Sequence, residues 1–156
     1  MHGLLHVRQD SDLAFRNKTA LSKTRDELLS ATGSRYAPAS PCEGLRKIET
    51  AAGPSVFIGK PCDVEAVRKT AVHRPQLAQQ LGVTIGIFCA GTPSTQGTLD
   101  LLKLHGVDAA QVDQLRYRGN GWPGSFAVRK VDRLRAQGWV ALADLPQRPV
   151  DRLAHE

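Results

Sequence analysis

The amino-acid sequence predicts an α/β fold, with a short, mostly parallel sheet, flanking helices and a strand-helix-strand-helix core. Two observations carry this prediction. The short, continuously apolar run at 55–58 suits a strand that is buried on both faces, and residues 83–89 have the β-branched composition of a second strand. A glycine-bearing turn and then a helical pattern follow each run, and this alternation favours parallel strands joined by right-handed crossovers.

The composition is that of one folded domain. The 156 residues suffice for a single core, and 41% hydrophobic with 23% charged residues excludes disordered, collagen-like and coiled-coil chains. No apolar run reaches the ~20 residues that span a bilayer, and residues 1–8 lack the apolar core of a secretory signal. We therefore expect a cytoplasmic protein without a membrane span, whose three cysteines are thiols or metal ligands.

Basic charge is concentrated near the end of the sequence. Most of the formal net charge of +6 arises from residues 115–156, which hold eight Lys and Arg against four Asp and Glu. This segment would attract anionic partners, but a solvated surface is the preferred interpretation. Few aromatic side chains lie between these charges to stack on single strands, so nucleic-acid binding is not expected.

The first third of the chain predicts two short helices. Residues 1–23 show no sustained period and predict an irregular segment with one short strand at most. Thr24 and Glu27 match a capping box, so a helix should begin there and end at Gly33. A second helix is predicted at 43–52, because apolar residues recur on one helical face.

The core elements follow in order. They are a strand at 55–58, a helix from Cys62 or Asp63 to a point before Pro75, a strand at 83–89, a turn at 90–94, a helix closed by Gly106, a short helix within 108–115 and a glycine-rich loop at 116–124. In a parallel sheet, ligands bind at the carboxyl ends of the strands. That edge is therefore where we look for a site.

Two cysteines occupy that predicted edge. Cys62 and Cys89 each follow a strand and precede a helix, where orphan N–H groups favour the thiolate that ligates metal. The same placement also suits small structural cysteines that cap helices. A zinc finger is excluded, since the sequence has neither a CxxC pair nor clustered histidines.

Glycine-bearing turns supply further candidate ligands. The turns at 33–35 and 91–95 carry the N–H and hydroxyl groups that bind phosphate at helix starts, although most such turns are structural. The loop at 116–124 combines arginines with glycines, which suits phosphate or carboxylate recognition or a tight structural loop. No Ser-His-Asp or paired-carboxylate arrangement indicates a hydrolase.

Four ordered motifs together resemble the coenzyme F420 hydrogenase/dehydrogenase beta-subunit family. The motifs are Gly33-Ser34-Arg35-Tyr36-Ala37-Pro38, Ile58-Gly59-Lys60-Pro61-Cys62-Asp63-Val64, Phe88-Cys89-Ala90-Gly91-Thr92-Pro93-Ser94 and Tyr117-Arg118-Gly119-Asn120-Gly121-Trp122-Pro123-Gly124. The resemblance covers about residues 14–129. It implies a flavin-dependent, iron–sulfur-linked oxidoreductase subunit that holds FAD beside a [4Fe–4S] cluster. Its electrons would pass to or from coenzyme F420 or a similar hydride acceptor.

The resemblance also implies site residues and partners. The implied cofactor-binding residues are Ser34, Arg35, Tyr36, Gly59, Lys60, Pro61, Cys62, Thr92, Ser94, Arg118, Asn120 and Trp122. Cys62 and Cys89 are the implied cluster ligands. The implied partners are other redox subunits or a ferredoxin-like electron donor.

The sequence departs from the family pattern in two respects. Three cysteines are one short of a conventional four-thiolate cluster, and residues 130–156 form a basic, divergent tail without cysteine. We therefore expect an irregular segment at 1–23, an incomplete flavin domain at 24–129 and a truncated or frameshifted bacterial gene product. The alternatives are a non-catalytic α/β domain that binds a nucleotide or a partner protein of the same complex, and a basic anion- or nucleic-acid-binding module.

Overall fold

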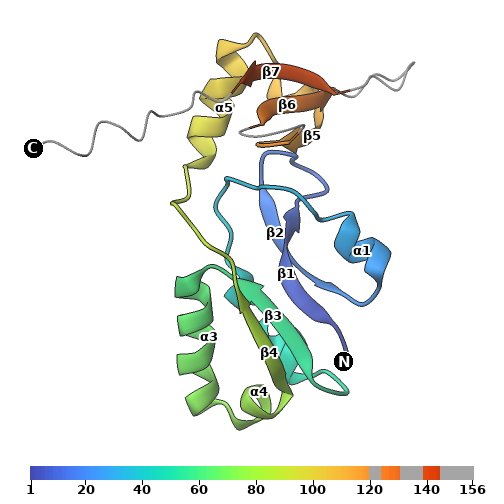
Figure 1. Ribbon diagram of the computed structural model, residues 1–156, viewed down its shortest axis with the longest axis vertical. Coiled ribbons are helices and arrows are strands. Elements are labelled where there is room, and N and C mark those ends of the chain that lie inside the picture. The colour runs from blue at the N-terminus through green and yellow to red at the C-terminus, as the bar shows by residue number, and fades with distance from the viewer. Residues whose placement is uncertain (120–123, 131–138, 145–156) are drawn as a thin grey trace, which may run out of the picture.

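A computed structural model describes residues 1–119, 124–130 and 139–144 of the chain. Its elements, in chain order, are β1 (Leu4–Gln9), β2 (Asn17–Ser22), α1 (Arg25–Leu29), η1 (Pro41–Gly44), α2 (Leu45–Glu49), β3 (Ser55–Gly59), α3 (Pro61–His73), α4 (Pro75–Gln80), β4 (Leu81–Gly86), α5 (Thr95–Leu104), η2 (Ala109–Gln111), β5 (Val112–Arg116), β6 (Ser125–Lys130) and β7 (Val140–Asp144). Figure 1 shows two groups of elements: β1 to β4 with α1, α3 and α4 at one end, and α5 with β5 to β7 at the other. We call them the first and second lobes.

The first lobe confirms the predicted α/β class. Its sheet has the order β2-β1-β3-β4, in which β1 pairs with β3 and β3 with β4 in parallel, while β2 runs antiparallel to β1. Between β3 and β4 the chain passes through α3 and α4, as parallel pairing requires. The predicted strand-helix-strand-helix core is therefore present, and α5 follows β4.

Helices pack on one face of this sheet. Leu5 and Phe57 lie opposite each other on β1 and β3 and are fully buried. They share a core with α2, α3 and α4, whose fully or nearly fully buried members are Leu45, Ile48, Val67 and Leu77. Side chains alternate between the faces of a strand, so the neighbours of Leu5 and Phe57 along their strands point to the other face. His6 and Ile58 lie on that second face, where the candidate site is found.

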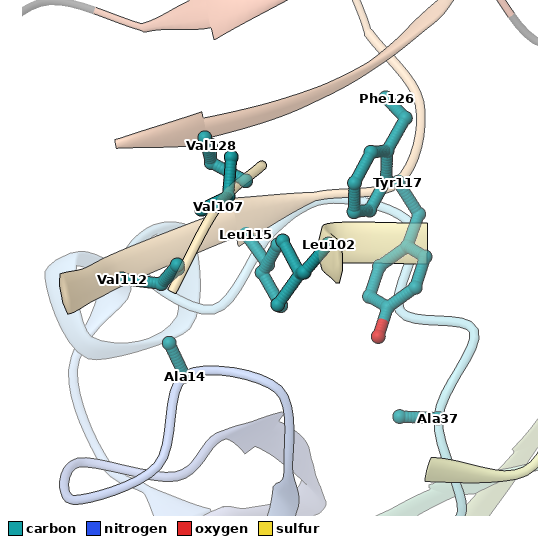
Figure 2. Close-up of a cluster of buried hydrophobic side chains, with 9 residues drawn as sticks. All are labelled: Ala14, Ala37, Leu102, Val107, Val112, Leu115, Tyr117, Phe126 and Val128. Carbon is teal, nitrogen blue, oxygen red and sulfur yellow. The ribbon is translucent and has the colours of Figure 1, made fainter. Parts of the chain in front are cut away.

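The second lobe contains an antiparallel sheet of order β5-β6-β7, which the sequence patterns did not predict. Figure 2 shows its core, in which Leu102 of α5 packs with Leu115, Tyr117 and Phe126. Ala14, from the loop between β1 and β2, joins this core together with Ala37. Loops that belong to the first lobe therefore anchor the second.

The local predictions are confirmed where a capping or period signal was strong. Thr24 accepts from the Glu27 N–H at 3.2 Å, and Glu27 accepts from the Thr24 N–H at 3.2 Å, which completes the capping box of α1. Gly106 has a positive φ of 64° immediately after the C-cap of α5. The strands β3 and β4 include most residues of the strands that were predicted at 55–58 and 83–89.

Two local predictions are wrong. Residues 1–23 form two strands, because the hairpin gains its stability by pairing with β3 and not from its own period. The helix α3 does end before Pro75, as predicted, and Pro75 opens a further helix, α4, at its first turn, where the missing N–H costs nothing. Within 108–115, the predicted helix is a single 3₁₀ turn followed by β5. In the described part of the chain, no helix is long and apolar enough to cross a bilayer.

Candidate functional site

A cavity of about 940 Å³ opens at the carboxyl ends of β3 and β4. Three segments supply most of its lining, namely 31–37 after α1, 58–60 at the end of β3 and 87–93 after β4. The remaining lining residues are His6, Val7, Asn17, Leu28, Ala39, Asp63 and Arg118. The cavity therefore lies where ligands bind in open α/β sheets, and its size is in the range of ligand and cofactor sites.

The end of β3 is built by a close approach between the strand and the first turn of α3. A β-carbon at Gly59 would lie 2.7 Å from Cβ of Asp63 and 2.9 Å from Cε1 of Phe57, so only glycine fits there. Asp63 accepts a hydrogen bond from the Lys60 backbone N–H at 2.9 Å and pairs with the Lys60 ammonium at 2.7 Å. The start of α3 and the Lys60 side chain are thus fixed at the cavity wall.

Arg35 is held by the protein through every N–H of its guanidinium. Its acceptors are Oδ1 of Asn17 at 2.8 Å, Oε1 of Gln9 at 2.9 Å, and the carbonyl oxygens of Ala14, Arg16 and Leu115 at 2.8, 3.0 and 3.1 Å. The guanidinium also lies 5.7 Å from the ring centroid of Tyr117. Burial lowers the pKa of Arg35 from its ordinary value, and the neighbouring Tyr117 opposes that shift. Arg35 thus links both lobes while lining the cavity.

Aromatic side chains position the neighbouring wall. Tyr36 packs against Tyr117 with ring centroids 5.6 Å apart, and its hydroxyl accepts from Nη1 of Arg118 at 3.3 Å. The hydroxyl of Tyr117 is itself buried and shares a 2.9 Å hydrogen bond with Thr98 of α5. These contacts connect the motif at 33–38 to the motif that begins at Tyr117.

The cavity is basic at some points and apolar at others. Among its described lining residues, Arg35, Lys60 and Arg118 are cationic and Asp63 is the only carboxylate. Ile58, Ile87, Phe88 and Leu28 supply apolar surface. A cavity with this lining favours an anionic ligand that also carries a flat or apolar part.

The three cysteines do not converge. Cys89 lines the cavity, whereas Cys62 is exposed on the first turn of α3 and is not part of the lining. Cys42 is partly buried, its Sγ lies 3.8 Å from the carbonyl oxygen of Asp63, and burial raises the pKa of its thiol. Within the described ranges, no group of three or more His, Cys, Asp and Glu residues is placed to hold a metal. These residues do not by themselves fit a four-thiolate [4Fe–4S] cluster.

The structure brings together most of the residues predicted for a cofactor. Those that line the cavity are Ser34, Arg35, Tyr36, Gly59, Lys60, Thr92 and Arg118, together with the predicted metal ligand Cys89. Pro61, Cys62 and Ser94 are not in the lining; Ser94 instead caps α5 by accepting from the Gly97 N–H at 3.1 Å. Asn120 and Trp122 lie outside the described residues.

Sequence reasoning missed the contribution of the N-terminal hairpin. His6 and Asn17 line the cavity from β1 and β2, within a segment that was predicted to be irregular. His6 is buried, and its Nε2 lies 2.7 Å from Oγ of Ser22. The alternation of Leu5 and Val7 with polar neighbours was the only signal available, and over so few residues it is weak.

Comparisons with known proteins bear on this site. Two family models, both for the beta subunit of coenzyme F420 hydrogenase/dehydrogenase, match the chain. The model of the N-terminal part matches residues 1–46, and the model of the C-terminal part matches residues 55–144. Among curated proteins, no sequence matches the chain.

The fold is also similar to that of a solved structure. A chain from the xenon-derivatized F420-reducing [NiFe] hydrogenase complex of Methanosarcina barkeri aligns with a TM-score of 0.63 and 21% identity. The match covers 90% of this chain and 48% of that chain, so this chain spans about half the length of the protein it matches. At that identity the likeness shows the fold.

Proposed function

Because the chain belongs to the coenzyme F420 hydrogenase/dehydrogenase beta-subunit family, we propose that its cavity binds FAD and that it serves as an F420-linked redox subunit. The cavity at the carboxyl ends of β3 and β4 carries this proposal. It joins residues of all four family motifs, which are far apart in the sequence, around one space with cationic and apolar walls.

Different lining residues of the cavity would bind different parts of a flavin dinucleotide. Lys60, fixed by Asp63 beside the start of α3, supplies positive charge for the pyrophosphate. Ile58, Ile87 and Phe88 offer apolar surface for the rings. When bound, the flavin would supply the hydride and electron-transfer chemistry. The chain itself would bind the flavin, orient it and exclude water from one side of it.

FAD binding is tested by titrating apoprotein into FAD and following the quenching of flavin fluorescence. We expect saturable binding with one FAD per chain, weakened by Lys60→Gln, which removes the cavity's ammonium. Lys69→Gln is the matched control, since Lys69 is an exposed residue of α3 that pairs with Glu65. Absence of saturation with the wild-type chain would refute the proposal, and equal affinities of the two variants would refute the role of Lys60.

The acceptor and the partners belong to the same proposal. We infer that electrons pass between the bound flavin and coenzyme F420, with other redox subunits or a ferredoxin-like protein as the electron donor. The family match and the resemblance to a chain of a hydrogenase complex support this. The flavin-loaded chain, reduced photochemically under argon, should bleach oxidised F420. If the flavin stays reduced in the presence of F420, the chain does not transfer electrons to F420. That result would favour the alternative of a non-catalytic domain that binds a nucleotide.

An iron–sulfur cluster is not part of the proposed mechanism of this chain. The described residues do not gather the required thiolates, and Cys62 lies outside the cavity that Cys89 lines. The assignment of Cys62 and Cys89 as cluster ligands remains a prediction for an assembly that brings further ligands.

A further inference from the structure

All N–H groups of the Arg35 guanidinium are hydrogen-bonded, but its positive charge is not paired with a negative one among the described residues. Its five N–H groups are taken up by carbonyl and amide oxygens of β1, β2, the loop between them and β5. All of these acceptors are neutral. Arg35 therefore has no N–H left with which to bind a ligand without breaking a contact that holds the lobes together.

The positive charge of Arg35 has no carboxylate partner among the described residues. The ion pairs there are Lys60–Asp63, Lys69–Glu65, Arg74–Glu49 and Arg129–Asp113. Asp63, the single carboxylate of the described cavity lining, is committed to Lys60. A partly buried cation ordinarily has a counter-ion nearby, because the low-dielectric surroundings make an unbalanced charge costly.

We propose that Arg35 is a specificity-determining residue that selects phosphate-bearing ligands by its charge, with the bound anion serving as its counter-ion. Arg35 does not donate to the ligand in this arrangement. The five neutral acceptors fix the guanidinium at the cavity wall, and its field lowers the energy of an anion inside. This inference rests on the proposed function only in taking the cavity as the binding site.

Inorganic pyrophosphate is the probe, because it carries the anionic part of a dinucleotide without its rings. Its affinity for the full chain is measured by NMR titration of the backbone amides of cavity residues such as Ser34, Gly91 and Thr92. Arg35→Met and Arg35→Lys both lose the five-fold hydrogen bonding, but only the lysine keeps the charge. We expect Arg35→Met to bind pyrophosphate on the order of tenfold more weakly than wild type, and Arg35→Lys to stay within about threefold.

A second variant tests the charge with Arg35 in place. Gln9→Glu puts a carboxylate where Oε1 of Gln9 now accepts from Arg35, while giving up the 2.8 Å donation from Nε2 of Gln9 to the Asp113 carbonyl oxygen, and Gln9 is not in the cavity lining. This change should weaken pyrophosphate binding as Arg35→Met does, even if neither Arg35 variant folds. Ser11→Glu, which adds the same charge at an exposed position of the same hairpin, is the control and should bind like wild type.

The outcomes separate this inference from the proposed function. Equal loss in the lysine and methionine variants, or wild-type affinity in Gln9→Glu, would assign Arg35 a purely structural role and overturn the inference. The inference would also be overturned if pyrophosphate caused no chemical-shift changes in the backbone amides of the wild-type cavity. If the chain binds FAD but its pyrophosphate affinity does not depend on the charge of Arg35, the proposed function stands and this inference is refuted. If pyrophosphate binding depends on that charge but FAD does not bind, the inference stands and the proposed function is refuted.

Discussion

Gly59→Ala is the sharpest test of how the cavity is built. The added β-carbon would lie 2.7 Å from Cβ of Asp63 and 2.9 Å from Cε1 of Phe57, where ordinary contacts begin at 3.4 Å. Neither neighbour yields easily, because the first is bonded directly to the backbone of α3 and the second belongs to a fully buried ring. The start of α3 must therefore move away from β3 by several tenths of an ångström.

The cost of that movement follows from overpacking in other cores. Inserting a methyl group into a well-packed site costs about 1–3 kcal/mol. With a urea m-value of about 1–3 kcal/mol/M, the unfolding midpoint should fall by roughly 1 M. Equilibrium unfolding in urea, followed by circular dichroism, measures this shift. In the folded variant, FAD affinity should also fall, because the displaced Asp63 no longer fixes Lys60.

Gly53→Ala is the matched control for this substitution. A β-carbon at Gly53 meets nothing within 4 Å, and Gly53 is outside the cavity lining. Its midpoint and FAD affinity should therefore remain near those of wild type. If the two alanine variants unfold at the same urea concentration, the close approach between β3 and α3 does not constrain the cavity, and the reasoning fails.

Three further predictions concern a buried hydrogen bond, a titrating cap and the cysteines. Tyr117→Phe leaves the Thr98 hydroxyl buried without its 2.9 Å partner and should cost about 1–3 kcal/mol of unfolding free energy, whereas Thr98→Val in the same background should cost little more. Backbone N–H groups lower the pKa of Glu27 in the folded chain, so its carboxylate stabilises the fold above the unfolded pKa, and this contribution is lost as the pH falls through the folded pKa. Glu27→Gln should therefore destabilise the chain more at neutral pH than under acid, as thermal unfolding across that range would show, and an offset that does not vary with pH would contradict this. After anaerobic reconstitution, the wild-type chain alone should hold no stoichiometric [4Fe–4S] cluster, so Cys62→Ser and Cys89→Ser should leave its iron content unchanged; a cluster signal in electron paramagnetic resonance that either variant abolishes would contradict this.

Elements stabilised by contacts between residues close in the sequence were predicted, and elements stabilised by contacts between distant residues were not. The capping box of α1 and the strand β3 were predicted, since their signals lie within a few residues. The hairpin of β1 and β2 was not, because its strands are stabilised by pairing with β3, which is more than thirty residues away in the sequence. The same limit hid β5 to β7, whose pairing and core depend on α5 and on the loop that carries Ala14.

The candidate site shows the same division at the level of single side chains. Ser34, Lys60, Thr92 and Cys89 were predicted from their motifs, and all four line the cavity. The predicted Cys62 is instead exposed outside it. A motif predicts that a turn exists, but the direction of each side chain depends on how the turn packs. Neighbouring residues on the first turn of α3 consequently face different surroundings.

The sequence by itself determined the α/β class, the order of the core elements and the family, because each rests on local periodicity or on short motifs in a fixed order. The tertiary structure decided what those motifs do. It assigned the N–H groups of Arg35 to acceptors in the β1–β2 hairpin and in β5, which left the charge of this residue as its contribution to the cavity. Hydrogen-bond partners that are distant in the sequence are fixed only when the chain is folded, and no local pattern encodes them.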